Sequence, residues 1–331
     1  MFCIVRPNSV NIEEIRQVIE PDMRRVDAVI RERLHSDVVL IRQVSEYIIG
    51  SGGKRLRPAL VLLSAGVFDY RGAHHHALAA VVEFIHTATL LHDDVVDESN
   101  LRRGRQTANA LFGNAASVLV GDFLYSRAFQ MMVGVADMRV MQVLADATNT
   151  IAEGEVLQLL NCNDPDIGEA RYLQVIRFKT AKLFEAATRI GAIISQASAR
   201  DEEAMAQYGM HLGTAFQLID DVLDYSGNHA DTGKNLGDDL AEGKPTLPLL
   251  YAMQQGTPAQ AALIRGAIEQ GDLADFTQVL ETIHATGALT YAAGQAQREV
   301  DIACAAIAHL PDSHYKQTLL ELAAFSVTRN H

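Results

Sequence analysis

The stretch Leu90-Leu91-His92-Asp93-Asp94-Val95-Val96-Asp97-Glu98 places three aspartates within five positions. The run before it, residues 77–91, is apolar and contains neither proline nor glycine, which favours a helix. On that helix Asp93 and Asp97 lie four residues apart and share a face. Two stacked carboxylates repel each other unless a cation lies between them, and a hard divalent ion such as Mg²⁺ prefers these oxygen ligands. The stretch predicts a metal-binding helix end, with a solvated acidic helix end as the alternative.

A second stretch repeats this spacing far along the chain. Phe216-Gln217-Leu218-Ile219-Asp220-Asp221-Val222-Leu223-Asp224-Tyr225 again ends an apolar helical run with the pattern Asp-Asp-x-x-Asp. Two copies of one metal-type signature disfavour the solvated alternative. They predict two helices that face each other across one site.

Cationic residues gather in two places near the first aspartates. Gly52-Gly53-Lys54-Arg55-Leu56-Arg57-Pro58 combines a glycine turn with three cations, and Leu101-Arg102-Arg103-Gly104-Arg105 begins shortly after Asp97. Glycines let backbone N–H groups approach a ligand, and guanidinium groups bind phosphate oxygens in pairs. A basic surface loop is the alternative for the first cluster taken alone. Metal-binding acids beside phosphate-binding bases predict a diphosphate substrate, and the apolar helices would shield a carbocation left by its departure.

Composition narrows the class of protein. The chain has 331 residues, of which 48 % are hydrophobic and 21 % charged, as in ordinary globular proteins. Its formal net charge of -13 argues against nucleic-acid binding. The three cysteines show neither zinc spacing nor a disulfide framework, and no signal peptide or membrane-spanning run is apparent. We expect a cytoplasmic protein with at most weak membrane association through an apolar product.

The pattern along the chain is helical throughout. We expect residues 1–10 to form a short tail, Pro21 to start a new helix, and residues 227–243 to form a polar, mobile lid. No alternation of strands and helices and no low-complexity linker interrupts the pattern. The predicted fold class is therefore all-α, with residues 11–331 in a single large helical bundle around a central apolar pocket.

The ordered set of these motifs resembles the trans-isoprenyl (polyprenyl) diphosphate synthase family. The resemblance rests on residues 52–58, 91–97, 102–104 and 216–224 and extends from about residue 11 to the end of the chain. It is strongest toward the bacterial octaprenyl branch, in Ile151-Ala152-Glu153-Gly154-Glu155-Val156-Leu157-Gln158 and in residues 237–248. The family resemblance implies the isoprenoid synthase fold and a Mg²⁺-dependent prenyltransferase.

The resemblance also implies roles for single residues. Asp93, Asp97 and Asp220 would bind Mg²⁺, supported by Asp94, Asp221 and Asp224. The residues implied to bind the allylic diphosphate are Arg102, Lys179, Thr180, Gln217, Lys234 and Lys244. Of these, Lys179 and Lys234 are also counted as catalytic. The residues implied to bind isopentenyl diphosphate are Lys54, Arg57, His86 and Arg103.

The family reaction ionises an allylic diphosphate such as farnesyl diphosphate, adds isopentenyl diphosphate and then loses a proton, with the departing diphosphate as the base. The resemblance implies three Mg²⁺ ions per site when both substrates are bound, with Mn²⁺ as a substitute, and a homodimer. Ala88 and Thr89 are small where short-chain members carry aromatic residues, and Met132 is our candidate for the floor of the product tunnel. We expect eight isoprene units, within a range of seven to ten, that supply a quinone side chain.

Three other interpretations remain open. A class I terpene cyclase shares the fold and the first aspartate motif, but lacks the isopentenyl site at Lys54 and Arg57. A non-catalytic regulatory subunit of a two-component synthase tends to lose the aspartates, which are intact here. A structural acidic protein would not explain the paired cation clusters. A requirement for a second substrate separates the first alternative from a synthase.

Overall fold

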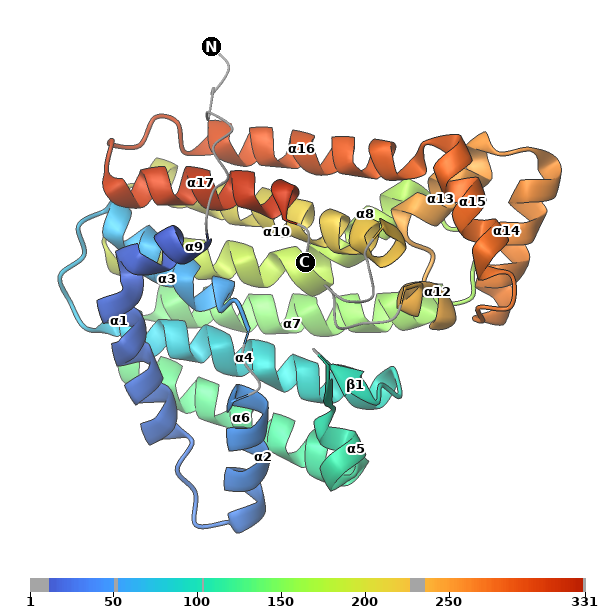
Figure 1. Cartoon of the computed structure of the whole chain (residues 1–331). Helices are drawn as coiled ribbons and strands as arrows, with labels where there is room; N and C mark the ends of the chain where they lie inside the picture. Colours follow the sequence, from blue (N-terminus) through green and yellow to red (C-terminus); the bar gives the residue numbers. More distant parts are fainter. Residues whose placement is uncertain (1–11, 51–52, 103, 227–235, 330–331) are drawn as a thin grey trace. The chain divides into compact units, whose positions relative to one another are not determined.

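The computed structural model describes residues 12–50, 53–102, 104–226 and 236–329 (Figure 1). Within these residues the regular secondary structure is helical apart from one short antiparallel hairpin, formed by β1 (Leu101–Arg102) and β2 (Arg105–Gln106). The predicted all-α class is confirmed, while the hairpin was not expected, since strands of two residues leave no periodic signal. No helix among the described residues combines the length and apolar character that crossing a membrane requires.

The chain forms two compact units. Unit 1 comprises Met1–Thr148, Leu183–Gly209 and Ala306–Leu322, and unit 2 comprises Asn149–Lys182, Met210–Ala305 and Ala323–His331. Boundaries between the units fall inside α7 (Met138–Asn161), after the first residue of α9 (Lys182–Ile194), and inside α10 (Ala199–Ser226), α16 (Ala288–Ala306) and α17 (His314–Thr328). A single domain from residue 11 onward stays a prediction, and the predicted tail, residues 1–10, lies outside the described part of the chain.

Unit 1 is organised around α4 (His74–Val96). This helix packs against α1 (Ile12–Arg33), α3 (Leu56–Val67) and α6 (Asn114–Val135) (Figure 1). Most residues of α4 between Leu78 and Ala88 are buried, as expected for a helix covered on all sides. The smaller helices α2 (Val39–Gly50) and α5 (Ala108–Phe112) pack on α6, and unit 1 also includes nearly all of α9 (Lys182–Ile194) and parts of α7, α10 and α17.

The prediction that Pro21 starts a new helix is wrong. Pro21 lies inside α1, which continues from Ile12 to Arg33. One row of buried residues runs past the proline, with Ile15 and Ile19 before it and Val26 and Ile30 after it. The apolar face of α1 therefore packs on the unit as one surface, and this packing keeps the helix continuous where a proline alone favours a break.

Unit 2 contains the second aspartate motif, at the end of α10. Its other described helices are α8 (Glu169–Ile176), the π-helix η1 (Arg177–Ala181), α12 (Asp238–Ala241), α13 (Leu247–Gln255), α14 (Pro258–Gln270), α15 (Phe276–Thr286) and nearly all of α16, together with parts of α7 and α17. A core that includes Tyr225, Leu240, Leu249, Ile264 and Val279 joins α10 to α12–α15. The prediction of a polar lid over residues 227–243 is partly wrong, because α12 forms within that range. Residues 227–235 of that lid lie outside the described residues.

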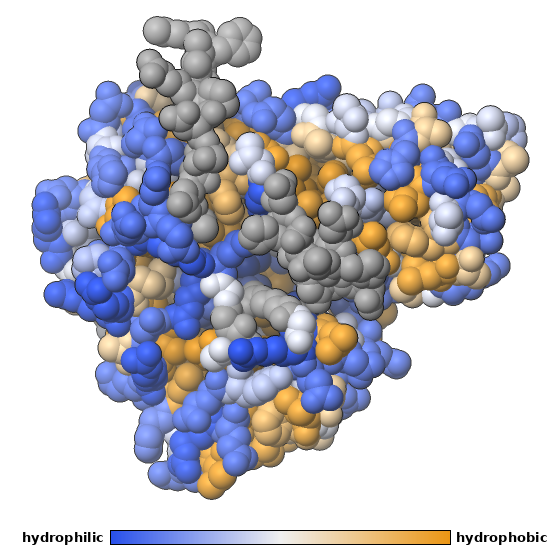
Figure 2. Space-filling view, viewed as in Figure 1, coloured by the Kyte–Doolittle hydropathy of each residue, from blue (hydrophilic) through white to orange (hydrophobic). Residues whose placement is uncertain are grey.

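Apolar side chains reach the surface at several places in unit 1. Figure 2 shows hydrophobic residues in the lower part of the view, where Figure 1 places α2 and α5. The exposed side chains there include Val38, Val39 and Leu111. One face of α6 carries a further exposed apolar row, which consists of Val118, Leu119, Phe129 and Val133.

Candidate active site

The first aspartate motif occupies the last turn of α4. Asp93 and Asp97 are both partly exposed, and Asp97 is the residue that ends the helix, with its N–H bonded to the Asp93 carbonyl at 2.8 Å. Asp94 is rotated by about 100° from Asp93 around the helix axis and is completely buried. The motif therefore presents its first and last carboxylates outward and buries the middle one.

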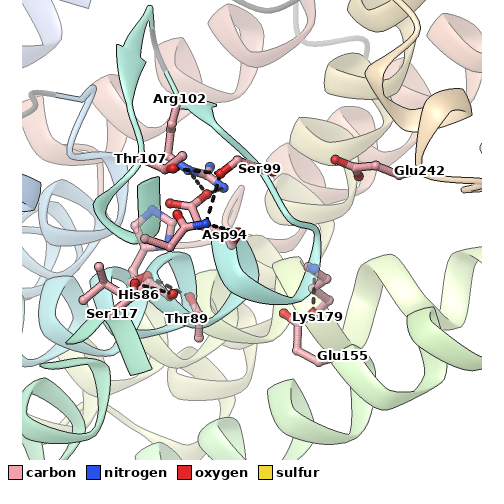
Figure 3. Close-up of polar contacts among 12 residues, drawn as sticks. His86, Thr89, Asp94, Ser99, Arg102, Thr107, Ser117, Glu155, Lys179 and Glu242 are labelled. Carbon is pink, nitrogen blue, oxygen red and sulfur yellow. Dashed lines mark hydrogen bonds and ion pairs between the residues drawn. The ribbon is translucent and has the colours of Figure 1, made fainter. Parts of the chain in front are cut away.

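Asp94 holds Arg102 in place. The Arg102 Nε and Nη2 atoms lie 2.8 and 2.7 Å from Oδ1 of Asp94 (Figure 3). Burial raises the pKa of Asp94 although the Arg102 charge acts in the opposite direction. Oδ2 of Asp94 is buried and has no hydrogen-bond partner among the described residues. Asp94 thus positions a cation, and its second oxygen is left for a further ligand.

The β1–β2 hairpin brings Arg102 back toward α4. Gly104 lies in its turn with a φ of 72°, in the left-handed region that glycine adopts without strain. Asn109 of α5 attaches the end of the hairpin segment to the end of α4, since its side chain donates to the carbonyls of Asp94 and Ser99 at 3.0 and 3.2 Å. The Thr107 hydroxyl also donates to the Ser99 carbonyl, at 2.7 Å (Figure 3). Arg103, which precedes the turn glycine, lies outside the described residues.

The cationic residues of the stretch 52–58 differ in their partners. Arg57 Nη1 lies 3.1 Å from Nε2 of His86, and its guanidinium lies over the Phe184 ring, 4.7 Å from the centroid. Arg55 instead pairs with Asp27 of α1 and takes a left-handed φ of 49° just before α3. Lys54 is partly exposed. The structure therefore joins Arg57 with His86, as a phosphate site would need, while Arg55 anchors the loop to α1.

The second aspartate motif repeats the pattern of burial. Asp220 and Asp224 are partly exposed and Asp221 is buried. The Tyr172 hydroxyl donates to Asp221 Oδ2 at 2.5 Å, and the Gln217 amide donates to Oδ1 at 2.8 Å. Gln217 in turn accepts a hydrogen bond from the Thr180 hydroxyl at 3.0 Å. The predicted residues Gln217 and Thr180 thus form one network with the buried aspartate.

Burial, together with the charge of Asp239, raises the pKa of Asp221 to about 8. The hydrogen bonds from Tyr172 and Gln217 act in the opposite direction, because they favour the ionised carboxylate. Asp239 also donates its backbone N–H to Asp224 Oδ2 at 3.2 Å, and the Gly237 N–H donates to the Asp224 carbonyl at 3.0 Å. The start of α12 is therefore attached to the last turn of the motif.

Arg329 contacts Asp220, the first aspartate of this motif. Its Nη2 lies 2.8 Å from Asp220 Oδ1 and donates to the Phe216 carbonyl at 2.7 Å. Its guanidinium stacks on the Phe216 ring, 3.7 Å from the centroid. Only 3 % of the Arg329 side chain is exposed, against 40 % of Asp220. The buried arginine therefore fixes one carboxylate oxygen and leaves the other side of Asp220 accessible.

Two predicted lysines are paired with glutamates. Lys179 Nζ lies 2.5 Å from Oε2 of Glu155 (Figure 3), and Lys244 pairs with Glu242. Lys179 belongs to the π-helix η1, which passes close to Gly154. A Cβ at Gly154 would lie 2.6 Å from the Lys179 backbone nitrogen, so only glycine allows this approach. Lys234, the third predicted lysine, lies outside the described residues.

The predicted chain-length residues lie on two packed helices of unit 1. Ala88 of α4 and Met132 of α6 are completely buried, and α4 packs against α6. Thr89 donates its hydroxyl to the His86 carbonyl at 2.7 Å (Figure 3). Phe129, one turn before Met132, is exposed by 36 %. Met132 therefore fits an interior position better than Phe129 does.

Three residues of these networks were missed in the sequence: Asn109, Tyr172 and Arg329. None belongs to a motif, and Tyr172 and Arg329 lie 49 and 109 residues from their aspartate partners. The only available signal was a polar residue on an otherwise apolar helical face, which many structural residues share. The two motifs themselves belong to different units.

Comparisons with known proteins all identify the same family. Residues 38–283 match the profile of the polyprenyl synthetase family. The chain is 54 % identical to octaprenyl diphosphate synthase of Escherichia coli (strain K12), over 97 % of this chain and 99 % of that protein. It is 44 % identical to the geranyl-diphosphate-specific all-trans-nonaprenyl-diphosphate synthase of Rhodobacter capsulatus, over 96 % and 98 %. The crystal structure of a polyprenyl synthase from Caulobacter crescentus CB15, complexed with calcium and isoprenyl diphosphate, superimposes with a TM-score of 0.95, at 44 % identity over 98 % of this chain and all of that one.

Proposed function

The chain belongs to the polyprenyl synthetase family, and we propose that it is a long-chain trans-polyprenyl diphosphate synthase whose product is octaprenyl diphosphate. It is a prenyltransferase that condenses an allylic diphosphate with successive molecules of isopentenyl diphosphate. The observation that carries the product assignment is the 54 % identity, over nearly the whole of both chains, to an octaprenyl diphosphate synthase. We further propose farnesyl diphosphate as the primer and a quinone side chain as the destination of the product.

The aspartates are proposed to bind Mg²⁺, with Mn²⁺ as a substitute. Asp93 and Asp97 offer outward-facing oxygens from adjacent turns, and Asp220 is oriented by Arg329. Oδ2 of Asp94, which is buried and has no hydrogen-bond partner among the described residues, fits an environment that is completed by a cation. When bound, Mg²⁺ neutralises the charge that develops on the departing diphosphate. A structurally similar polyprenyl synthase contains calcium together with an isoprenyl diphosphate, and we propose three Mg²⁺ ions with both substrates present here.

The cationic residues divide between the two substrates. Arg102 is proposed to bind the allylic diphosphate, and Asp94 holds its guanidinium in a fixed orientation. The same substrate would contact Lys179, Thr180, Gln217, Lys234 and Lys244. Arg57 and His86, which lie together, are proposed to bind isopentenyl diphosphate with Lys54 and Arg103. The departing diphosphate then removes the proton, so no protein base is required.

The test of this function is a product assay. We would incubate the purified chain with farnesyl diphosphate, labelled isopentenyl diphosphate and Mg²⁺, and size the extracted products. A single band of eight isoprene units that disappears with EDTA is the expected result. Products of fifteen or twenty carbons would refute the long-chain assignment. No incorporation with any allylic primer would refute the synthase activity and favour a regulatory subunit.

Product length is proposed to depend on Ala88, Thr89 and Met132. Each helical turn advances ~5.4 Å, roughly one isoprene unit, and Ala88 and Thr89 lie one turn before the first aspartate. A phenylalanine at position 88 should therefore stop elongation early, whereas Met132→Ala should lengthen the product. The measurement is the product distribution of each variant beside the unchanged chain. The proposal fails if Ala88→Phe does not shorten the product and Met132→Ala does not change it.

We also propose a homodimer, formed through the exposed apolar face of α6. Val118, Leu119, Phe129 and Val133 lie along this face, and the exposed fractions of Leu119 and Val133 are 66 % and 63 %. The occupant is a second copy of the chain, in which residues 11–331 act as one catalytic domain. The combined change Leu119→Asp and Val133→Asp should give a monomer in light scattering. Ile302→Asp, at an exposed apolar position on α16, is the control and should stay dimeric.

A further inference from the structure

A cluster of two histidines and one aspartate lies in unit 1 and includes none of the residues assigned above. Asp22 belongs to α1, and His75 and His76 belong to the first turn of α4. Nε2 of His76 lies 2.9 Å from Asp22 Oδ1, and Nε2 of His75 lies 3.8 Å from the same oxygen. One ligand atom from each of the three residues lies within 4.8 Å of the others. No other group of three potential ligands this close occurs among the described residues.

The spacing fits one metal ion. Zn²⁺ binds imidazole nitrogen and carboxylate oxygen at about 2.0–2.1 Å, so two ligands of a tetrahedral ion lie about 3.3 Å apart. The separations of 2.9 and 3.8 Å lie on either side of that value. Adjacent residues of a helix normally point about 100° apart, yet the two imidazole rings lie with their centroids 3.8 Å apart. Both rings therefore converge on Asp22.

Both imidazoles are largely buried. Only 12 % of the His75 side chain and 8 % of the His76 side chain are exposed. Nδ1 of His75 is buried without a hydrogen-bond partner among the described residues, so no hydrogen bond through this nitrogen fixes the ring.

We propose that Asp22, His75 and His76 bind a divalent transition-metal ion, Zn²⁺ by preference, with water as the fourth ligand. Imidazole with carboxylate selects Zn²⁺, Co²⁺ or Ni²⁺, whereas oxygen-only sites suit Mg²⁺. The proposed ion differs in kind from the ions at the aspartate motifs. It links α1 to the start of α4, the helix whose other end carries Asp93 and Asp97. Its role is structural, since it holds α1 against the helix that presents the aspartates.

Co²⁺ provides the test, because tetrahedral Co²⁺ with nitrogen ligands absorbs visible light strongly and octahedral Co²⁺ with oxygen ligands absorbs weakly. The full chain, freed of any histidine tag, is titrated with Co²⁺ in the presence of excess Mg²⁺, which occupies the aspartate motifs. We expect strong absorption that saturates at one ion per chain and disappears when Zn²⁺ is added. Weak absorption throughout the titration would overturn the proposal, and so would saturation at several ions per chain.

Variants show whether these residues are the ligands. His75→Gln removes one ligand but keeps the hydrogen bond between Asp22 and His76, so it is the variant expected to fold. His76→Gln and Asp22→Asn complete the set. Each should weaken Co²⁺ binding by at least about tenfold. Loss of an outer-shell partner of a metal ligand already weakens metal binding by about 10- to 100-fold, and loss of the ligand itself should not weaken it less.

The matched control is His74→Gln, because His74 is exposed and belongs to the same run of three histidines. It should bind Co²⁺ like the unchanged chain. Equal losses in His74→Gln and His75→Gln would point to nonspecific binding by the histidine run and overturn the proposal. A second readout is the melting temperature, which Zn²⁺ should raise in the unchanged chain and in His74→Gln, but not in His75→Gln. Neither readout depends on catalytic activity, so either result is independent of the proposed reaction.

Discussion

Replacing Tyr172 by phenylalanine tests the network that supports the second aspartate motif. Tyr172 and Asp221 are 5 % and 2 % exposed, and the tyrosine hydroxyl donates to Asp221 Oδ2 at 2.5 Å. The change removes only this hydroxyl. A hydrogen bond between neutral groups contributes about 1 kcal/mol to stability, and one to a charged group contributes about 1.5–3 kcal/mol. The loss therefore depends on whether Asp221 is ionised.

The pKa of about 8 for Asp221 in the metal-free protein sets the pH dependence. Burial, its largest cause, raises this pKa above the ordinary carboxyl value, so the folded chain binds a proton more tightly than the unfolded chain. Stability is then lost as pH rises toward the folded pKa. Burial also raises the pKa of Tyr172, which keeps its hydroxyl a donor over this range. We expect Tyr172→Phe to cost about 1 kcal/mol below the pKa of Asp221 and about 1.5–3 kcal/mol above it.

The assay is urea unfolding in EDTA at one fixed protein concentration, on either side of the pKa of Asp221. Tyr225→Phe is the matched control, because Tyr225 is also buried, at 1 % exposure, but among the described residues its hydroxyl has one hydrogen-bond partner, the Thr246 hydroxyl, which donates to it at 3.4 Å. The control should lose less stability than Tyr172→Phe, and its loss should vary little with pH. Equal losses in the two variants would refute the assigned hydrogen bond. A loss for Tyr172→Phe that does not grow with pH would refute the ionisation argument.

Two further predictions concern residues beside the motifs. Gly154→Ala should destabilise the chain by about 1–3 kcal/mol, because its Cβ would lie 2.6 Å from the Lys179 backbone nitrogen. Gly294→Ala, a helical control whose Cβ would meet nothing within 4 Å, should stabilise it by about 0.5–1 kcal/mol in the same unfolding assay. Arg329→Gln should cost about 1–3 kcal/mol, because the hydrogen bonds and ring contact of a buried guanidinium are lost. A melting temperature equal to that of the unchanged chain would contradict this anchoring role for Arg329.

The elements that the sequence predicts well are those defined by local spacing. Asp93 and Asp97 share a face because four residues make about one helical turn, whatever the rest of the chain does. The same local rule places Asp220 with Asp224 and gives the all-α class. Local rules also explain the failure at Pro21, since the proline favours a break that the continuous apolar face of α1 overrides.

The partners of these aspartates are set by tertiary packing and were not predictable in the same way. Arg102 was expected to bind phosphate, but nothing in its spacing indicated that Asp94 would hold it. Tyr172 approaches Asp221 only because α8 and the second part of α10, from Met210 onward, fold into the same unit. Arg329 lies in a stretch that reads as a polar tail, yet its side chain is almost completely buried. A polar residue acquires such a role from its distant neighbours, which a single sequence does not identify.

The two aspartate motifs have the same spacing, but the buried carboxylate of each motif has different neighbours. In each, the second aspartate turns into the protein, while the first and last stay partly exposed. Asp94 is compensated by a full positive charge, that of Arg102, whereas the donors to Asp221 among the described residues, Tyr172 and Gln217, are neutral. Burial raises the pKa of both carboxyls. At Asp94 the charge of Arg102 opposes this effect, whereas at Asp221 the charge of Asp239 adds to it. The sequence pattern is symmetric, and the difference in electrostatic environment between its two copies comes from the residues packed against them.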